Sequence, residues 1–395
     1  MNTDYDSLMN KNAVEMKPSG IRKFFDIAQQ LDGVISLGVG EPDFKTPWKV
    51  RQAAIETLEK GRTCYTANAG LRELRQEIAG YINNSLGVKY DPDTEILVSV
   101  GGSEAIDLAV RALVSPGDEV LVVEPCFVCY TPIIRMMGGI PVPIETKVED
   151  DFRLTAEQLK EKITDKTKAL ILPYPNNPTG AVMRKEDLEP IAEVLRGTDI
   201  FVITDEIYSE LTYSGRHFSI IELEDMRERS ILINGFSKSF AMTGWRLGFA
   251  AAPAGIMKHM LKLHQYCIMS SPTTSQYAAV TALHDCMNDI TKMKNEYNMR
   301  RRYLVDGFNK LGLTCFTPQG AFYVFPCIRS TGLSSDEFCE RLVYSKKVAV
   351  VPGNNFGASG EGFVRVSYAY SLNHLKEALK RIKEFLDELE NEKKQ

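Results

Sequence analysis

The chain has 395 residues, of which 44% are hydrophobic and 25% charged. This composition is typical of globular proteins, and the length predicts two unequal domains. The 47 lysines and arginines against 52 aspartates and glutamates give a net charge of −5, so no basic excess indicates binding to nucleic acid or to an anionic membrane. Because the start lacks signal-peptide features and no apolar run has the length of a membrane span, we expect a cytoplasmic protein.

The eight cysteines in so long a chain do not indicate a disulfide framework. Cys126 and Cys129 form a lone Cys-x-x-Cys pair, but no second ligand pair follows at a spacing suited to zinc. The five histidines form no metal-binding pattern. We therefore expect no metal.

From about residue 95, short β-branched runs alternate with helical patterns. The expected strands are 96–100, 119–123, 169–172, 200–204 and 231–233, and helices are expected at 103–113 and 184–195. Strands that alternate with helices indicate an α/β fold with three layers, in which a mostly parallel sheet carries helices on both faces.

After about residue 290 this rhythm stops. The expected elements are helix 293–311, strand 321–325, a helix from 336, strands 348–351 and 363–367, and helix 372–389. Helices and strands without parallel crossovers predict a smaller α+β domain. We expect residues 46–290 to form the large cofactor-binding domain, and residues 1–45 and 291–395 to form the small one.

A glycine-rich turn, Gly101-Gly102-Ser103-Glu104, follows strand 96–100 and opens the next helix. The free N–H groups and the positive dipole end of a helix N-terminus favour an anion, and glycine lets the backbone approach it. Ser103 could bind phosphate or only cap the helix. The turn matches neither the Walker loop nor the dinucleotide fingerprint, so it predicts an anion site and not a nucleotide site.

Further candidates follow strand ends, where ligands bind in open α/β sheets. The proline-rich segment 172–180 is either a structural turn or a loop that binds a ligand. In the second case Asn177 could donate a hydrogen bond to an oxygen on an aromatic ring of that ligand. Asp205 ends an apolar strand, where a carboxylate is costly unless it is paired, and a pyridinium N–H would pair it. Tyr208 could form a hydrogen bond with a phenolic oxygen on the same ligand ring. Phe127 could stack on that ring or belong to the hydrophobic core.

Lys238 follows the apolar run 231–233 in a turn that contains Ser237, with Arg246 eight residues later. The lysine is either an exposed turn residue or a buried amine nucleophile, because burial lowers the pKa of an amine. Serine and arginine are residue types that hold a phosphate. An amine beside a phosphate clamp suggests pyridoxal phosphate bound as an imine.

In this order the segments resemble the fold-type I, class I/II aminotransferases, pyridoxal-phosphate enzymes related to aspartate and aromatic aminotransferases. Within that group they look most like bacterial aminotransferase A-type enzymes. The resemblance runs from Ile35 to Ala369 and implies a seven-stranded sheet in the large domain. It rests on Gly40-Glu41-Pro42-Asp43-Phe44, Tyr65, Gly102-Ser103, Asn177-Pro178-Thr179-Gly180, Asp205 to Tyr208, Ser237-Lys238, Arg246 and Phe363-Val364-Arg365-Val366-Ser367.

The resemblance implies pyridoxal 5'-phosphate as the cofactor and gives roles to the residues around it. Lys238 would be the Schiff-base lysine and proton shuttle, Asp205 would keep the pyridine nitrogen protonated, and Tyr208 would contact the ring hydroxyl. Asn177 would also contact that hydroxyl, and Phe127 would stack on the ring. The phosphate would be bound by Gly102, Ser103, Ser237, Arg246 and, from the neighbouring subunit of a homodimer, Tyr65.

The resemblance also implies a substrate site. Arg365 would clamp the α-carboxylate, helped by Asn177 and the backbone N–H of Gly40. The amino group of an L-amino acid would pass to a 2-oxo acid, with 2-oxoglutarate as the expected acceptor, in a ping-pong cycle. The preferred side chain stays open, since acidic or aromatic substrates could be read by Arg22, Phe24, Tyr65, Arg111 or Tyr323.

Two other activities compete with transamination. A carbon–sulfur β-lyase would share the fold and the lysine, but it would release pyruvate and a thiol. A regulator with an aminotransferase-like domain would need a basic helix-turn-helix module ahead of that domain, and we do not expect one in the 34 residues before Ile35.

Overall fold

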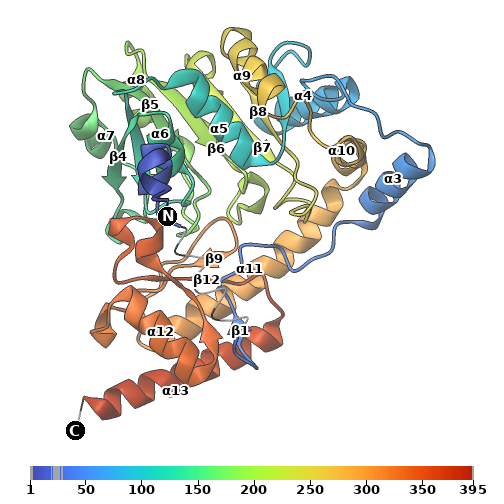
Figure 1. The fold of residues 1–395 in the computed structure, drawn as a ribbon. Helices are drawn as coiled ribbons and strands as arrows, with labels where there is room; N and C mark the ends of the chain where they lie inside the picture. The colour runs from blue at the N-terminus through green and yellow to red at the C-terminus, as the bar shows by residue number, and fades with distance from the viewer. Residues whose placement is uncertain (1–2, 19, 21–26, 28–29, 394–395) are drawn as a thin grey trace.

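The larger part of the protein is built on a seven-stranded sheet with the order β2-β8-β7-β6-β5-β3-β4 (Figure 1). The structure is a computed structural model that describes residues 3–18, 20, 27 and 30–393. Strand β8 is antiparallel to β2 and β7, and the other neighbours pair in parallel. The strands are β2 (Ile96–Ser99), β3 (Glu119–Glu124), β4 (Ile140–Glu145), β5 (Thr167–Leu172), β6 (Phe201–Asp205), β7 (Ser230–Gly235) and β8 (Gly248–Ala251).

Helices cover both faces of this sheet. Successive strand residues point to opposite faces, so Ile203 packs against one helical layer and Val202 against the other. The first layer holds α5 (Gly102–Leu113), α6 (Tyr130–Met136) and α9 (Ala254–Cys267). The second holds α3 (Trp48–Glu59), α4 (Arg72–Leu86), α7 (Ala156–Lys162), α8 (Lys185–Leu195) and α10 (Thr273–Asp285). The predicted three-layer α/β architecture is confirmed.

The predicted α+β region is also present, and it lies below the large sheet in Figure 1. Its hydrophobic cluster joins α11 (Met287–Lys310), α12 (Ser335–Lys346) and α13 (Leu372–Glu392) to short strands. Strands β11 (Val351–Pro352), β12 (Val364–Ser367) and β9 (Tyr323–Val324) form an antiparallel sheet, while β1 (Ile35–Ser36) pairs in parallel with β10 (Val348–Ala349).

Two of the expected strands in this region differ from the structure. The run 348–351 is split between β10 and β11, which belong to separate sheets, because the chain changes partners at Val350. The run 321–325 shortens to β9, because Ala321 has a φ of 56°, which lies outside the extended region.

The exact residues that divide the two parts remain a proposal, with 46–290 in the large domain and 1–45 and 291–395 in the small one. The hydrophobic clusters interlock across this division. Tyr208 and Leu211 pack in the cluster of the smaller region, whereas Phe325 and Phe363 pack in that of the large sheet.

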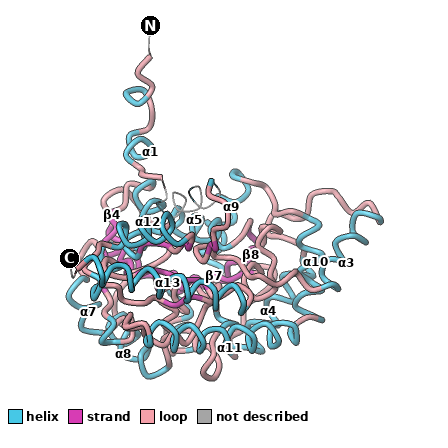
Figure 2. Tube along the Cα trace, turned by 90° about the horizontal axis from the view of Figure 1, so that it is seen from below, coloured by secondary structure: helices cyan, strands magenta, loops and turns pink. Residues whose placement is uncertain are grey.

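One short helix lies outside these packed layers. Figure 2 shows α1 (Lys11–Glu15) projecting from the body of the molecule on the N-terminal side. Among the residues that the structure describes, no helix combines the length and the apolar character needed to cross a membrane.

Candidate active site

A cavity of about 350 Å³ lies at the carboxyl ends of the parallel strands and reaches the smaller region. It is the kind of site that an open α/β sheet offers to a ligand. Eleven of the twelve residues that the sequence places at the cofactor or the substrate line it, all but Tyr65: Gly40, Gly102, Ser103, Phe127, Asn177, Asp205, Tyr208, Ser237, Lys238, Arg246 and Arg365.

Lys238 extends into the cavity from the turn after β7. Its Nζ donates a hydrogen bond of 2.6 Å to the carbonyl oxygen of Gly40. Burial lowers the pKa of the Lys238 amine to about 8, and the carboxylate of Glu41 opposes this shift. An appreciable fraction of the amine is therefore unprotonated near neutral pH, as a nucleophile requires. Lys238 is therefore not an exposed turn residue, because its side chain is largely buried and lines the cavity.

Asp205 lies at the end of β6 and is 7% exposed. Its Oδ2 accepts a hydrogen bond of 2.7 Å from the hydroxyl of Tyr130, and its Oδ1 accepts one of 3.2 Å from the backbone N–H of Ile207. Burial raises the pKa of Asp205, whereas these two hydrogen bonds lower it. A buried carboxylate with no salt-bridge partner among the described residues suits a cationic group of a ligand.

The N-terminus of α5 forms the anion end of the cavity. Gly101 is the N-cap, with a φ of 78° and no side chain to occupy the first N–H groups of the helix. A Cβ on Gly101 would lie only 2.9 Å from Nη2 of Arg246, so the close approach of this guanidinium requires glycine. Ser103 lies inside the first turn and is not the cap, which makes the capping alternative for Ser103 wrong.

Arg365 is 3% exposed and lies between two aromatic rings, with its guanidinium carbon 4.4 Å from the ring centre of Tyr323 and 4.7 Å from that of Phe356. Nη1 donates to Asn177 Oδ1 at 2.9 Å, and Nη2 donates to the carbonyl of Gly38 at 2.6 Å. Within the described part of the chain, Nε is buried without a partner. The guanidinium is held in place and forms no ion pair with a carboxylate of the residues that the structure describes, so it can bind the carboxylate of a ligand.

Two further aromatic side chains, Tyr208 and Phe127, line the same cavity as Lys238 and Asp205. Tyr208 shares a hydrogen bond of 2.9 Å with Tyr323 through their hydroxyl groups. Phe127 lines the cavity and meets Tyr130 edge to face, with 6.2 Å between the ring centres. Phe127 thus contributes an apolar ring surface that carries no hydrogen-bonding group.

The donor set fits pyridoxal phosphate. The amine of Lys238 suits its aldehyde, the buried carboxylate of Asp205 suits a protonated ring nitrogen, and the uncapped helix beside Arg246 suits its phosphate. No group of three or more His, Cys, Asp and Glu side chains suited to a metal occurs among the described residues.

Some sequence-predicted residues lie elsewhere. Tyr65 is 80% exposed and does not line the cavity. Arg111 also lies outside it and pairs with Asp107 at 2.6 Å on α5. Arg22 and Phe24 fall outside the described residues. Of the residues proposed to select the side chain of the substrate, Tyr323 lines the cavity.

Sequence reasoning missed Tyr130, whose hydroxyl contacts Asp205, and Thr243, which lines the phosphate end. Tyr130 begins α6 directly after the loop that follows β3 and contains Phe127, so its place near a strand end was an available signal. Its contact with Asp205 depends on strand order, since β5 lies between β3 and β6. Spacing along the chain does not show that order.

Known proteins are similar to this chain over nearly its whole length. Residues 32–382 match the family model described as aminotransferase class I and II. The Bacillus subtilis protein YugH is 52% identical over 380 residues, which cover 96% of this chain and 98% of YugH. An aspartate aminotransferase from Pyrococcus abyssi is 46% identical, covering 94% of this chain and 97% of its own length. A solved aromatic aminotransferase from Pyrococcus horikoshii has a TM-score of 0.89 at 46% identity, covering 92% of this chain and 99% of that one.

Proposed function

The chain belongs to the class I and II aminotransferases, which depend on pyridoxal phosphate, and we propose that it moves the amino group of an L-amino acid to 2-oxoglutarate by a ping-pong cycle. The observation that carries this proposal is the meeting of Lys238, Asp205 and Arg365 around one cavity. Together they supply an amine, a buried carboxylate and a carboxylate clamp.

Lys238 and Asp205 perform the chemical work in this proposal. When bound, pyridoxal phosphate accepts the electron pair of the substrate Cα–H bond and carries the amino group between the two substrates. Lys238 would hold the cofactor through its aldehyde, and the free amine of Lys238 would move the proton from the substrate Cα to that aldehyde carbon. Asp205 pairs with the ring nitrogen and keeps it protonated, and Tyr208 and Asn177 contact the ring hydroxyl.

The substrate is oriented by its α-carboxylate. Arg365 offers a planar fork already fixed by Asn177 and the carbonyl of Gly38. The backbone N–H of Gly40 joins this clamp, and a Cβ at Gly40 would lie 2.6 Å from the hydroxyl of Tyr323. Glycine at this position therefore keeps the mouth of the cavity open for the incoming amino acid.

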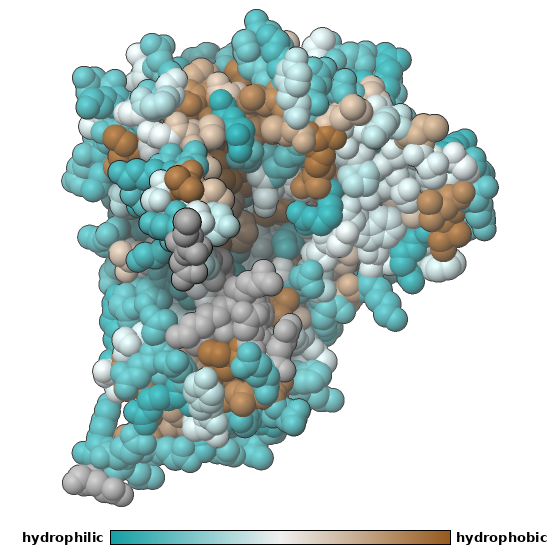
Figure 3. All heavy atoms as spheres, viewed as in Figure 1, coloured by the Kyte–Doolittle hydropathy of each residue, from teal (hydrophilic) through white to brown (hydrophobic). Residues whose placement is uncertain are grey.

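We also propose a cytoplasmic homodimer in which Tyr65 contacts the phosphate bound by the other subunit. Its ring is exposed in the single chain and free to reach outward. An apolar area at the right of Figure 3 lies over α3, where Trp48, Ile55 and Leu58 are 58%, 46% and 59% exposed. Exposed apolar groups gathered on one helix favour burial against a second copy.

The test is a panel of amino donors with 2-oxoglutarate, with L-glutamate measured as the product. At least one donor should give glutamate in proportion to the oxo acid that it loses. If the enzyme transfers amino groups only to other oxo acids, the acceptor in this proposal is wrong while the reaction class stands.

A further inference from the structure

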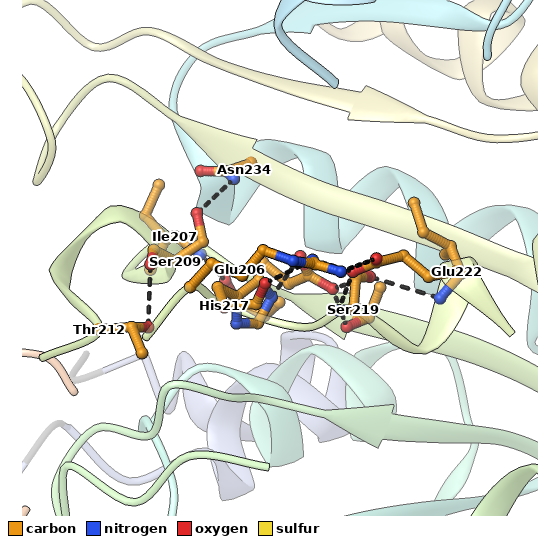
Figure 4. A network of polar contacts seen from close by, with 12 residues as sticks. Glu206, Ile207, Ser209, Thr212, His217, Ser219, Glu222 and Asn234 are labelled. Atoms are coloured by element: carbon orange, nitrogen blue, oxygen red, sulfur yellow. Dashed lines mark hydrogen bonds and ion pairs between the residues drawn. The ribbon is translucent and has the colours of Figure 1, made fainter. Parts of the chain in front are cut away.

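A second network of polar side chains surrounds Glu206, the residue that follows Asp205 in the chain (Figure 4). Glu206 directly follows β6 and does not line the cofactor cavity that Asp205 lines, but borders a second cavity instead. Glu206 is 1% exposed, and its Oε1 accepts hydrogen bonds from Thr204, at 2.9 Å, and from Ser219. Its Oε2 lies 2.7 Å from Nε2 of His217.

His217 joins this network from the loop that follows β6. Its side chain is 9% exposed and borders the second cavity, which has a volume of about 250 Å³. The same loop is fixed by Ser219, whose backbone N–H donates to Glu222 at 2.9 Å. Glu206 is thus enclosed by a strand, a loop and a side chain that can carry a positive charge.

The other charged groups near this cavity have their own partners or lie beyond contact with Glu206. Arg216 forms two hydrogen bonds with Glu222, at 2.9 and 2.7 Å. Glu210 accepts from the hydroxyl of Tyr81, and Lys294 lines the cavity without an ion pair to Glu206. Among the described residues, His217 is the basic side chain within ion-pair distance of Glu206.

Two buried carboxylates therefore occupy consecutive positions, Asp205 as the last residue of β6 and Glu206 directly after it. Burial raises the pKa of Asp205, and the charge of Glu206 adds to that shift. A raised pKa favours the neutral form of Asp205. The proposed function requires the ionised form, because Asp205 must be a carboxylate to pair with a protonated ring nitrogen. A positive charge beside Glu206 would cancel its effect on Asp205.

We propose that His217 is a positioning residue for the cofactor site, which in its protonated form neutralises Glu206 and so keeps the neighbouring Asp205 ionised. This inference rests on the proposed function, because Asp205 has no need of charge without a cationic ligand. It gives a role to the His217–Glu206 pair, which contacts neither the cofactor cavity nor the substrate clamp.

The test uses the cofactor-loaded enzyme and the pH midpoint at which the absorption band of the bound cofactor changes. His217→Gln keeps a hydrogen-bond donor but removes the charge, so an uncompensated carboxylate remains next to Asp205 in the chain. The midpoint should rise by on the order of half a pH unit. The double variant Glu206→Gln/His217→Gln has no charge to compensate and should return to the wild-type midpoint.

The matched control is His284→Gln, which removes a histidine that pairs with Asp285 at the surface. It should leave the midpoint unchanged. A wild-type midpoint in His217→Gln would overturn the proposal. A double variant displaced further than the single one would also overturn it, because this result indicates a packing role for the pair.

A second readout does not require the variants to be active. Only five histidines are present, so the imidazole nitrogen NMR signals of the cofactor-loaded wild type can be assigned one by one. His217 should give the signals of an imidazolium at neutral pH, and signals of a neutral ring would overturn the proposal. Failure of borohydride to fix the cofactor on Lys238 would instead count against the proposed function and leave this NMR result standing.

Discussion

The hydroxyl of Tyr130 donates a hydrogen bond of 2.7 Å to Oδ2 of Asp205. Both groups are buried, and the pair joins the helix after β3 to the end of β6. Burial raises the pKa of Tyr130 well above that of free tyrosine, with the charge of Asp205 adding to the shift, so the phenol stays a donor. This contact stabilises the ionised form of Asp205 and fixes the direction in which the carboxylate points.

We expect Tyr130→Phe to slow the half-reaction with an amino acid by about 10-fold to 100-fold, because a hydrogen bond to a charged group contributes roughly 1.5–3 kcal/mol. Without the donor the pKa of Asp205 should rise, so the acid limb of the pH–rate profile should move to higher pH. The difference in rate between the variant and the wild type should therefore become smaller as pH increases. Tyr81→Phe is the matched control, since Tyr81 donates to Glu210 outside the cavity. An unchanged acid limb in Tyr130→Phe would show that Tyr130 does not influence Asp205.

Asp205→Asn should keep the cofactor but lose most of the chemistry. A neutral amide has the shape of the carboxylate but cannot hold a ring nitrogen in its protonated form. The half-reaction rate should fall by orders of magnitude while thermal unfolding shifts little. Stopped-flow spectra and a melting curve on the same preparation separate the two effects, and near-normal rates would mean that the carboxylate is only structural.

Arg365→Lys should weaken binding of every amino donor by a similar amount, because all share the α-carboxylate. Lysine cannot reproduce the planar fork between Tyr323 and Phe356, and the loss should be roughly 2–4 kcal/mol in kcat/KM with the cofactor spectrum kept. Arg381→Lys, on α13 away from the cavity, serves as the control. A loss confined to acidic donors would make Arg365 a reader of the side chain.

Tyr65→Phe should lower the affinity for the cofactor without changing the oligomeric state. In the proposed dimer the ring would keep its place, but the hydroxyl that we propose to contact the phosphate of the other subunit would be absent. Equilibrium dialysis of the cofactor measures the affinity, and light scattering measures the mass. Tyr266→Phe, at another exposed tyrosine, should change neither, and a fully active wild-type monomer would contradict the shared site.

The sequence predicted which residues line the cavity better than it predicted the details of the fold around them. Asp205 ends a buried strand, and Asn177 and Lys238 each follow one. Because the carboxyl ends of parallel strands meet at one edge, their meeting follows from topology. Strand β4 was not predicted because Pro141 and Pro143 interrupt its pattern, and an edge strand tolerates proline since one side of its ladder is free.

Two other relationships needed the folded chain. Tyr130, at the start of α6, contacts Asp205 at the end of β6, and His217 contacts Glu206 from a later position in the loop after β6. Neither spacing nor hydrophobic pattern shows which loops fold over which strand ends. Hydrogen bonds of this kind depend on strand order and on side-chain direction, which a single sequence does not display.

The most direct test of the whole account is a single turnover of the cofactor-loaded enzyme with L-glutamate and no oxo acid. Glutamate is the product of the proposed acceptor, so the reverse half-reaction must occur. The account predicts that the cofactor converts to its amine form, that one equivalent of 2-oxoglutarate appears per site, and that Lys238→Ala abolishes the conversion. An unchanged cofactor with glutamate, together with release of pyruvate and thiol from a β-thio amino acid, would contradict it and identify a lyase.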